Sequence, residues 1–150
     1  LLARAYSADS YLNLELIENG YVSKFLVQPS ELSLFDDAQS RAIEKSRGIW
    51  IKSPDFGCIE TTIEKEEEFV ILQNLCSSLE TKGWVLKDES TKRYKFPSLS
   101  FSSLILYSSS GQDDKTQLHW GHKNVWNNDR DSLYLFDQEG KLLAYESYGY

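Results

Sequence analysis

Residues 126–148 read WNNDRDSLYLFDQEGKLLAYESY, and this stretch contains the pattern that decides the fold. Two runs rich in apolar and aromatic residues, 132–137 and 142–148, flank the turn residues Gln138-Glu139-Gly140. Two such runs joined by a short turn that contains glycine are typical of a β-hairpin. The end of the sequence therefore predicts antiparallel β-structure.

The same kind of pattern extends back to about residue 54. Six further β-rich runs are Cys58–Ile63, Phe69–Asn74, Trp84–Lys87, Arg93–Phe96, Ser100–Ser108 and Leu118–Gly121. Turn clusters separate them at intervals of about 8–12 residues, which favours an antiparallel sandwich or barrel. We expect residues 54–150 to form one all-β unit, with the boundary near Ser53-Pro54.

The first fifty residues show helical spacing instead. Asn13 is the expected N-cap of a helix over residues 14–19, and Gly20 stands where a left-handed residue would end that helix. A second helix is predicted from Ser33 to Gly48. Its apolar stripe at helical spacing consists of Phe35, Ala38, Ala42 and Ser46. The expected fold class is α+β, with a helical segment over 1–53 and an all-β unit over 54–150.

Composition and charge limit the function classes. The 150 residues contain 16 Lys and Arg against 23 Asp and Glu, a net charge of −7, which disfavours a broad nucleic-acid interface. No apolar run approaches the ~20 residues that cross a bilayer, so we expect no membrane span. Met is absent and no signal-peptide pattern follows Leu1, which indicates a processed or shortened chain.

Residues suited to metal or redox chemistry are few. Cys58 and Cys76 are too few for a disulfide scaffold. They fit one bridge in a secreted protein or two buried thiols, and we favour the thiols. A spacing of three residues on an extended segment places His119 and His122 on opposite faces. We therefore expect a solvated loop pair there and no zinc site.

Oxygen ligands concentrate in one short stretch, formed by Asn127, Asn128, Asp129 and Asp131. Such a cluster suits a hard cation such as calcium, with Asp129 and Asp131 as the candidate ligands. It also suits a tight turn, because Asn and Asp side chains bond to their own backbone, and turn chemistry is the favoured interpretation.

The tryptophans allow two interpretations. An exposed row of aromatic rings can stack on sugars or bases, whereas buried rings pack between two sheets. We expect Trp84 and Trp120 to be core residues. Trp126 is the candidate for exposure, and with Asn127 and Asn128 it forms the candidate binding site.

Three stretches of the first half are distinctive in sequence and in order. Residues 2–6 read LARAY, residues 13–21 read NLELIENGY, and residues 38–50 read AQSRAIEKSRGIW. Together they resemble the C-terminal part of a staphylococcal-nuclease-like (thermonuclease) domain. The resemblance implies structural roles for Asn13, Gly20, Gly48 and Trp50.

That family is a five-stranded OB barrel with three helices, and it hydrolyses DNA and RNA with calcium. Its catalytic residues lie on the barrel, which by this alignment would precede Leu1. The resemblance therefore implies no catalytic residue and no cofactor in this chain, calcium in the parent domain, and the missing barrel as a partner.

Four stretches of the second half are distinctive. They read EFVILQN at 68–74, GWVLKD at 83–88, YKFP at 94–97 and WNNDRDSLYLFD at 126–137. They resemble a lamin-tail domain, which implies an immunoglobulin-like sandwich that binds rather than catalyses. The two resemblances together imply an exported or extracellular bacterial protein.

The resulting hypothesis is the C-terminal fragment of a thermonuclease-like phosphodiesterase that carries a binding or targeting module. The alternative is a stand-alone interaction or structural module, whose partner would be a protein, a cell surface or nucleic acid. A homodimer formed by edge strands is a variant of that alternative. A sandwich that binds carbohydrate through Trp126 is a third hypothesis.

Overall fold

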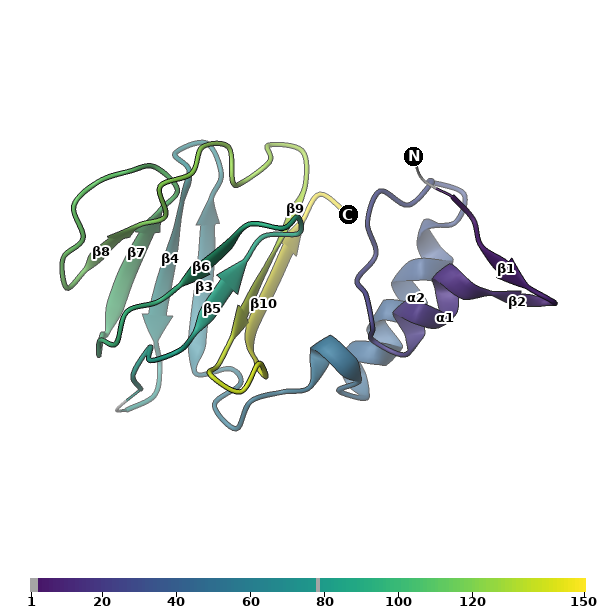
Figure 1. Cartoon of the computed structure of the whole chain (residues 1–150), viewed down its shortest axis with the longest axis horizontal. Helices are drawn as coiled ribbons and strands as arrows, with labels where there is room; N and C mark the ends of the chain where they lie inside the picture. The colour runs from purple at the N-terminus through teal and green to yellow at the C-terminus, as the bar shows by residue number, and fades with distance from the viewer. Residues whose placement is uncertain (1–2, 78) are drawn as a thin grey trace. The chain divides into compact units, whose positions relative to one another are not determined.

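The computed structural model describes residues 3–77 and 79–150. The chain divides into two compact units, Leu1–Lys52 and Ser53–Tyr150, which we call the helical unit and the sandwich unit. Both α-helices belong to the first unit, and the two four-stranded sheets belong to the second (Figure 1). The expected coarse fold class, α+β with a mostly β second part, is confirmed.

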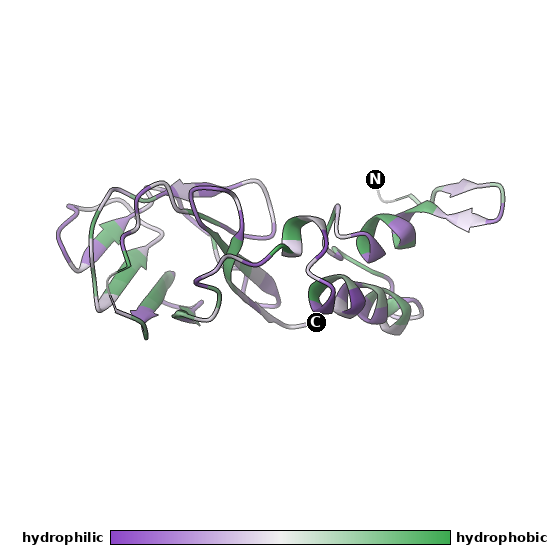
Figure 2. Cartoon of the chain, turned by 90° about the horizontal axis from the view of Figure 1, so that it is seen from below, coloured by the Kyte–Doolittle hydropathy of each residue, from purple (hydrophilic) through white to green (hydrophobic). Residues whose placement is uncertain are grey.

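The helical unit is built from short elements. They are β1 (Tyr6–Ser7), β2 (Ser10–Tyr11), α1 (Leu12–Glu18), α2 (Leu32–Glu44) and the 3₁₀-helix η1 (Gly48–Trp50). Hydrophobic and hydrophilic residues alternate along α2 (Figure 2), and the predicted stripe is buried at Phe35, Ala38 and Ala42. The nuclease resemblance implies a barrel strand over residues 2–6. Leu2 lies outside the described residues, and of residues 3–6 only Tyr6 is in a strand.

The predicted N-cap Asn13 and the predicted helix start at Ser33 both differ from the structure. Helix α1 begins at Leu12, and Asn13 lies inside it. The Asn13 amide instead accepts from the backbone N–H of Ala5 (2.8 Å) and donates to the carbonyl of Ala3 (3.2 Å). The β1–β2 hairpin brings that preceding segment beside the helix, so Asn13 joins two segments rather than capping one. Ser33 likewise lies inside α2, which begins at Leu32.

Gly20 ends α1 as predicted. Its φ of +72° is left-handed, its N–H donates to the carbonyl of Ile17 (2.9 Å), and the N–H of Tyr21 donates to Leu16 (2.9 Å). These two bonds form the Schellman motif, which satisfies carbonyls that the last helical turn leaves unpaired.

Gly48, in contrast, does not end α2. The helix ends at Glu44, and Ser46 takes the left-handed position with φ +49° and donates its N–H to the carbonyl of Ile43 (3.1 Å). Gly48 begins η1 instead. Its position is explained by a close approach to Gly20.

The two glycines lie where two backbone segments meet. The N–H of Ile49 donates to the carbonyl of Gly20 (2.8 Å). A Cβ on Gly20 would lie 2.1 Å from the carbonyl oxygen of Arg47, and a Cβ on Gly48 would lie 2.2 Å from that of Gly20. No side chain fits at either position, so this contact requires glycine at both.

The sandwich unit contains two four-stranded sheets. Its strands are β3 (Ile59–Glu64), β4 (Phe69–Asn74), β5 (Val85–Lys87), β6 (Arg93–Lys95), β7 (Ser103–Tyr107), β8 (Gln117–His119), β9 (Asp131–Phe136) and β10 (Leu142–Tyr148). One sheet has the order β10-β9-β5-β6 and the other β3-β4-β7-β8, and only β7 and β8 pair in parallel. All eight predicted runs contain a strand, and the bounds of β4 and β10 are as predicted.

Side chains from both sheets form one core. Leucines of β4, β5, β7, β8 and β9 are fully buried there. Trp84 is 5% exposed and Trp120 is 9% exposed, so both are core residues as expected. Trp84 contacts Phe96 and Phe101 edge to face, with ring centroids 6.5 and 6.2 Å apart. The unit is therefore a β-sandwich that packs around its own aromatic and leucine-rich core.

The expectation of two buried thiols is wrong, because Cys58 and Cys76 form a disulfide. Pairing of Ile59 with Asn74 places the cysteines just outside the two strands, and the N–H of Leu75 donates to the carbonyl of Cys58 (2.8 Å). The bridge closes the open end of the β3–β4 hairpin. Sequence spacing could not reveal this pairing, since it depends on the strand register.

Of the helices that the structure describes, none has the length and apolar character needed to span a membrane.

Replacing Gly20 with Ala is expected to unfold the helical unit. The left-handed conformation alone costs Ala about 1–2 kcal/mol, and the overlap with the Arg47 carbonyl adds to it. Thermal melting followed by circular dichroism at 222 nm measures the loss. Gly57→Ala is the control, because Gly57 has φ +86° but nothing within 4 Å of its would-be Cβ. Equal effects of the two substitutions would contradict the steric argument.

Reduction of the Cys58–Cys76 bridge is expected to lower the free energy of unfolding of the sandwich unit. The bridged residues are 18 apart in sequence. Closing a loop of that length stabilises by about 3 kcal/mol. Urea unfolding with and without dithiothreitol, followed by tryptophan fluorescence, measures the change. An unchanged midpoint would show that the native register holds the hairpin without the bridge.

Candidate functional site

The acidic loop before β9 is organised by one carboxylate. Asp131 is fully buried, and both of its oxygens are used. Oδ1 accepts from the N–H groups of Ser132 (2.8 Å) and Glu89 (3.2 Å). Oδ2 accepts from the backbone N–H and the side-chain amide of Asn127 (3.1 and 3.0 Å). The carboxylate therefore joins the β5–β6 turn to the loop after β8.

Two opposing effects act on the pKa of the Asp131 carboxyl. Burial raises the pKa of Asp131, and the amides of Asn127, Ser132 and Glu89 that donate to it oppose that shift. A second buried carboxylate, Asp88, accepts from both the N–H and the hydroxyl of Ser90 (3.0 and 2.9 Å). Each carboxylate is thus stabilised by local donors, in the way that buried charges in proteins usually are.

The candidate calcium ligands do not form a site. Asp131 is committed to backbone donors, whereas Asp129 is exposed. Within residues 3–77 and 79–150, His, Cys, Asp and Glu side chains form no group of three or more that could hold a metal ion. The described residues therefore provide no set of ligands for the calcium ion that the nuclease resemblance implies for its parent domain.

The two histidines differ from each other. His122 is exposed, as expected of a loop residue. His119 lies in β8, its side chain is only 15% exposed, and its ring stacks on Tyr107 with centroids 5.3 Å apart. Its Nδ1 lies 3.3 Å from a carboxylate oxygen of Asp113. The expectation of a solvated pair is therefore wrong for His119, because β8 extends the sheet through it.

Trp126 is buried, which overturns its assignment as an exposed binding residue. It is 2% exposed, and its ring lies 6.3 Å from that of Trp120. The Glu68 carboxylate accepts from the N–H groups of Val125 (3.0 Å) and Trp126 (3.4 Å), and so holds the loop against the core. A buried indole presents no face for a sugar or base to stack on, so Trp126 does not support the carbohydrate hypothesis.

The two asparagines of the candidate site are exposed residues with local partners. The Asn127 amide is taken by Asp131, and the Asn128 carbonyl accepts from the Lys65 ammonium (2.6 Å). The motif WNNDRD is thus explained as a folded loop that ends in a buried anchor. A ligand at Asn127 or Asn128 stays an untested prediction.

A groove lies along the seam between β3 and β10, the edge strands of the two sheets. It consists of two hollows of about 320 and 400 Å³, and Glu146 lines both. The Thr61 hydroxyl donates to the Glu146 carboxylate (2.7 Å) across the seam. No sequence signal marks this groove, since Thr61 and Glu146 are 85 residues apart.

The groove is acidic. Its carboxylates are Glu60, Glu64, Glu66, Glu67 and Glu146. Lys65 also lines it, but its ammonium donates to the Asn128 carbonyl and lies over the Tyr148 ring, 5.3 Å from the centroid. Several negative charges along one seam produce a negative potential that attracts cationic groups.

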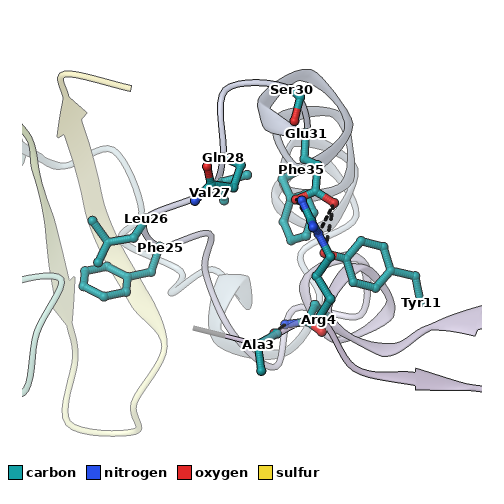
Figure 3. A pocket seen from close by; sticks show the side chains of 11 residues that line it. Ala3, Arg4, Tyr11, Phe25, Leu26, Val27, Gln28, Ser30, Glu31 and Phe35 are labelled. Atoms are coloured by element: carbon teal, nitrogen blue, oxygen red, sulfur yellow. Dashed lines mark hydrogen bonds and ion pairs between the residues drawn. The ribbon is translucent and has the colours of Figure 1, made fainter. Parts of the chain in front are cut away.

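The helical unit contains a pocket of about 470 Å³, shown in Figure 3. The Arg4 guanidinium pairs with both carboxylate oxygens of Glu31 (2.9 and 3.0 Å), and the Tyr11 hydroxyl donates to the same carboxylate (3.2 Å). The hydrogen bond and charge of Arg4 lower the pKa of Glu31. Because Arg4 is paired in this way, it is not a free group for holding phosphate.

Comparison with known proteins identifies no family. The sequence matches no protein-family model, and no curated protein matches it. The nuclease and lamin-tail resemblances therefore rest on the residues of this chain.

Asp131→Ala is expected to lower the free energy of unfolding of the sandwich unit by more than about 3 kcal/mol. The substitution removes a buried carboxylate and leaves the four N–H groups that donate to it without their acceptor. Urea unfolding measures the loss. Asp129→Ala is the matched control two residues away on the exposed side of the loop, and should change stability by less than about 0.5 kcal/mol. Similar small effects of both would show that Asp131 does not anchor the loop.

Proposed function

We propose that the helical unit is the C-terminal part of a staphylococcal-nuclease-like domain and that the sandwich unit is a lamin-tail-like binding module. The parent protein is then a calcium-dependent phosphodiesterase that acts on DNA or RNA. The order of a hairpin, a helix that ends at Gly20, a second helix and a buried Trp50 supports the first assignment.

The observation that carries this proposal is the apolar surface of the helical unit. Among its described residues, the buried hydrophobic side chains are those of Ile17, Phe35, Ala38, Ala42 and Trp50. Large hydrophobic side chains remain exposed, including Tyr6, Leu16, Tyr21, Val22, Phe25 and Leu34. A unit of about fifty residues buries little surface by itself, and a barrel packed against these side chains would complete its core.

Catalysis is assigned to the barrel and not to this chain. Arg4 is neutralised by Glu31, and the described carboxylates hold no arrangement suited to calcium. What this chain contributes is support: the helices would pack under the barrel, and the sandwich would hold the enzyme at a surface, a partner or its substrate.

Strand order supports an immunoglobulin-like assignment for the sandwich. In immunoglobulin lettering, β3, β4 and β7 match strands A, B and E, and β10, β9, β5 and β6 match G, F, C and C′. Trp84, directly before β5, is a buried tryptophan near strand C. The disulfide differs from that of antibody domains, since it links the ends of β3 and β4 within one sheet.

The disulfide also supports an exported or extracellular location, because structural disulfides persist in oxidising compartments. The alternative, a stand-alone interaction module, is favoured by one observation: the sandwich unit has its own core and its own covalent bridge. Binding would then be the whole function of the chain.

The test compares residues 1–150 with the longest product translated from the same gene. We expect only the longer product to hydrolyse DNA with calcium, and chelation to reduce the rate by at least about 10³-fold. Gly48→Ala in the longer product should abolish activity by preventing the helices from packing, whereas Asp129→Asn should not. A longer product without a barrel, or one with no calcium-dependent cleavage, would favour the interaction module.

A further inference from the structure

We propose that the free edge of β3 binds an extended peptide segment in which basic and apolar residues alternate, as an added strand of the β3-β4-β7-β8 sheet. The partner is defined by its chemistry: main-chain groups that pair with β3, lysine or arginine on one face, and apolar side chains on the other. This inference concerns the sandwich unit alone and does not depend on the nuclease assignment.

The backbone of β3 offers hydrogen-bonding groups at its outer edge. β3 is the terminal strand of its sheet, and Leu75 N–H donates to the carbonyl of Cys58. In an antiparallel pair, hydrogen-bonded positions alternate, so the N–H and C=O groups of Ile59, Thr61 and Ile63 point away from β4. Among the described residues, no other segment pairs its backbone with these three, which leaves a template for strand addition.

The side chains of β3 specify which strand would fit. Ile59 is 4% exposed and belongs to the core cluster, and Ile63 packs against that cluster. Glu60 and Glu64 alternate with them and lie on the other face of the strand. Cross-strand neighbours stand roughly 4.5–5.5 Å apart at Cβ. An added strand would therefore place apolar residues beside the isoleucines and cationic residues beside the glutamates.

The groove along β3 has room for such a strand and the charge to select it. The two hollows beside β3 measure about 320 and 400 Å³. Glu146 contributes a further carboxylate from the opposite sheet, and Glu66 and Glu67 extend the negative charge past the end of β3. Among the described residues that line the groove, Lys65 supplies an ammonium group, and this group is already bonded to the Asn128 carbonyl. Cationic peptides are thus attracted, and phosphate backbones are repelled.

A second copy of this chain fits the edge less well. Pairing of β3 with another β3 would bring glutamates together, and like charges across a strand pair destabilise it. The basic edge strand β6 has a suitable pattern, with Arg93 and Lys95 on either side of Tyr94. Its edge is partly occupied, however, because the Trp120 indole N–H donates to the Arg93 carbonyl (3.1 Å). The charge pattern therefore favours a different, basic partner.

The experiment uses residues 1–150 labelled with ¹⁵N and a seven-residue peptide of alternating lysine and valine, with acetyl and amide ends. NMR titration is expected to shift the backbone resonances of β3 and of Glu146, with affinity that falls as salt rises. Two control peptides separate the contribution of side-chain charge from that of backbone hydrogen bonding. Glutamate in place of lysine should abolish binding, and N-methylation of the backbone groups that would face β3 should do the same while preserving the charge.

Protein variants test the same edge. Glu60→Gln combined with Glu64→Gln should weaken binding about tenfold, because two opposite-charge contacts are lost. Thr61→Pro removes an outward N–H from an edge strand, a position where proline is tolerated, and should also weaken binding. Glu139→Gln, in the exposed β9–β10 turn, is the matched control and should leave affinity unchanged. Circular dichroism checks that each variant is folded.

Several results would overturn the proposal. These are no shifts at millimolar peptide, shifts that map away from β3, or equal affinity for the N-methylated peptide, which would indicate charge attraction without strand addition. Sedimentation velocity without peptide is the remaining measurement, and a monomer is expected. Concentration-dependent assembly that Thr61→Pro abolishes would show that the occupant of this edge is a second copy of the chain.

Discussion

The sandwich unit depends on one buried carboxylate. Asp131 stands at the first position of β9, and its two oxygens bind the β5–β6 turn at Glu89 and the preceding loop at Asn127. Those four hydrogen bonds hold the end of the loop that follows β8. Glu68 holds the neighbouring part of the same loop through the backbone amides of Val125 and Trp126. The most distinctive stretch of the sequence therefore contains a folding anchor, Asp131, which the sequence alone offers as a candidate ligand.

The helical unit depends on a different constraint, the close approach of two backbones at Gly20 and Gly48. This contact needs no side chain, and it lets the segment after α2 return to the end of α1. The core that results is small, and large apolar side chains remain at the surface. The two units thus differ: the sandwich unit has its own core and a disulfide, whereas the helical unit leaves large apolar side chains exposed.

In the sandwich unit, glutamate side chains line the seam between the edge strands β3 and β10. Edge strands invite unwanted pairing, and charged side chains are one way in which natural sheets limit it. Here the acidic residues of the β3 seam discourage identical copies, while the outward backbone groups of Ile59, Thr61 and Ile63 pair with no other described segment. The same charges that oppose self-association therefore define the kind of strand that the edge would accept.

Features that depend on neighbours along the chain were predictable from the sequence. Alternation and turn residues located β4 and β10 to the residue, and the buried stripe of α2 and the end of α1 at Gly20 followed from helical spacing. Other features became visible in the folded chain: the Cys58–Cys76 bond, the roles of Asn13 and Gly48, the burial of Trp126 and the groove between β3 and β10. Each of these depends on a partner brought close by folding, such as Glu68 for Trp126, 58 residues away. Local periodicity reports which face of an element is buried, but it contains no information about which distant group meets that face.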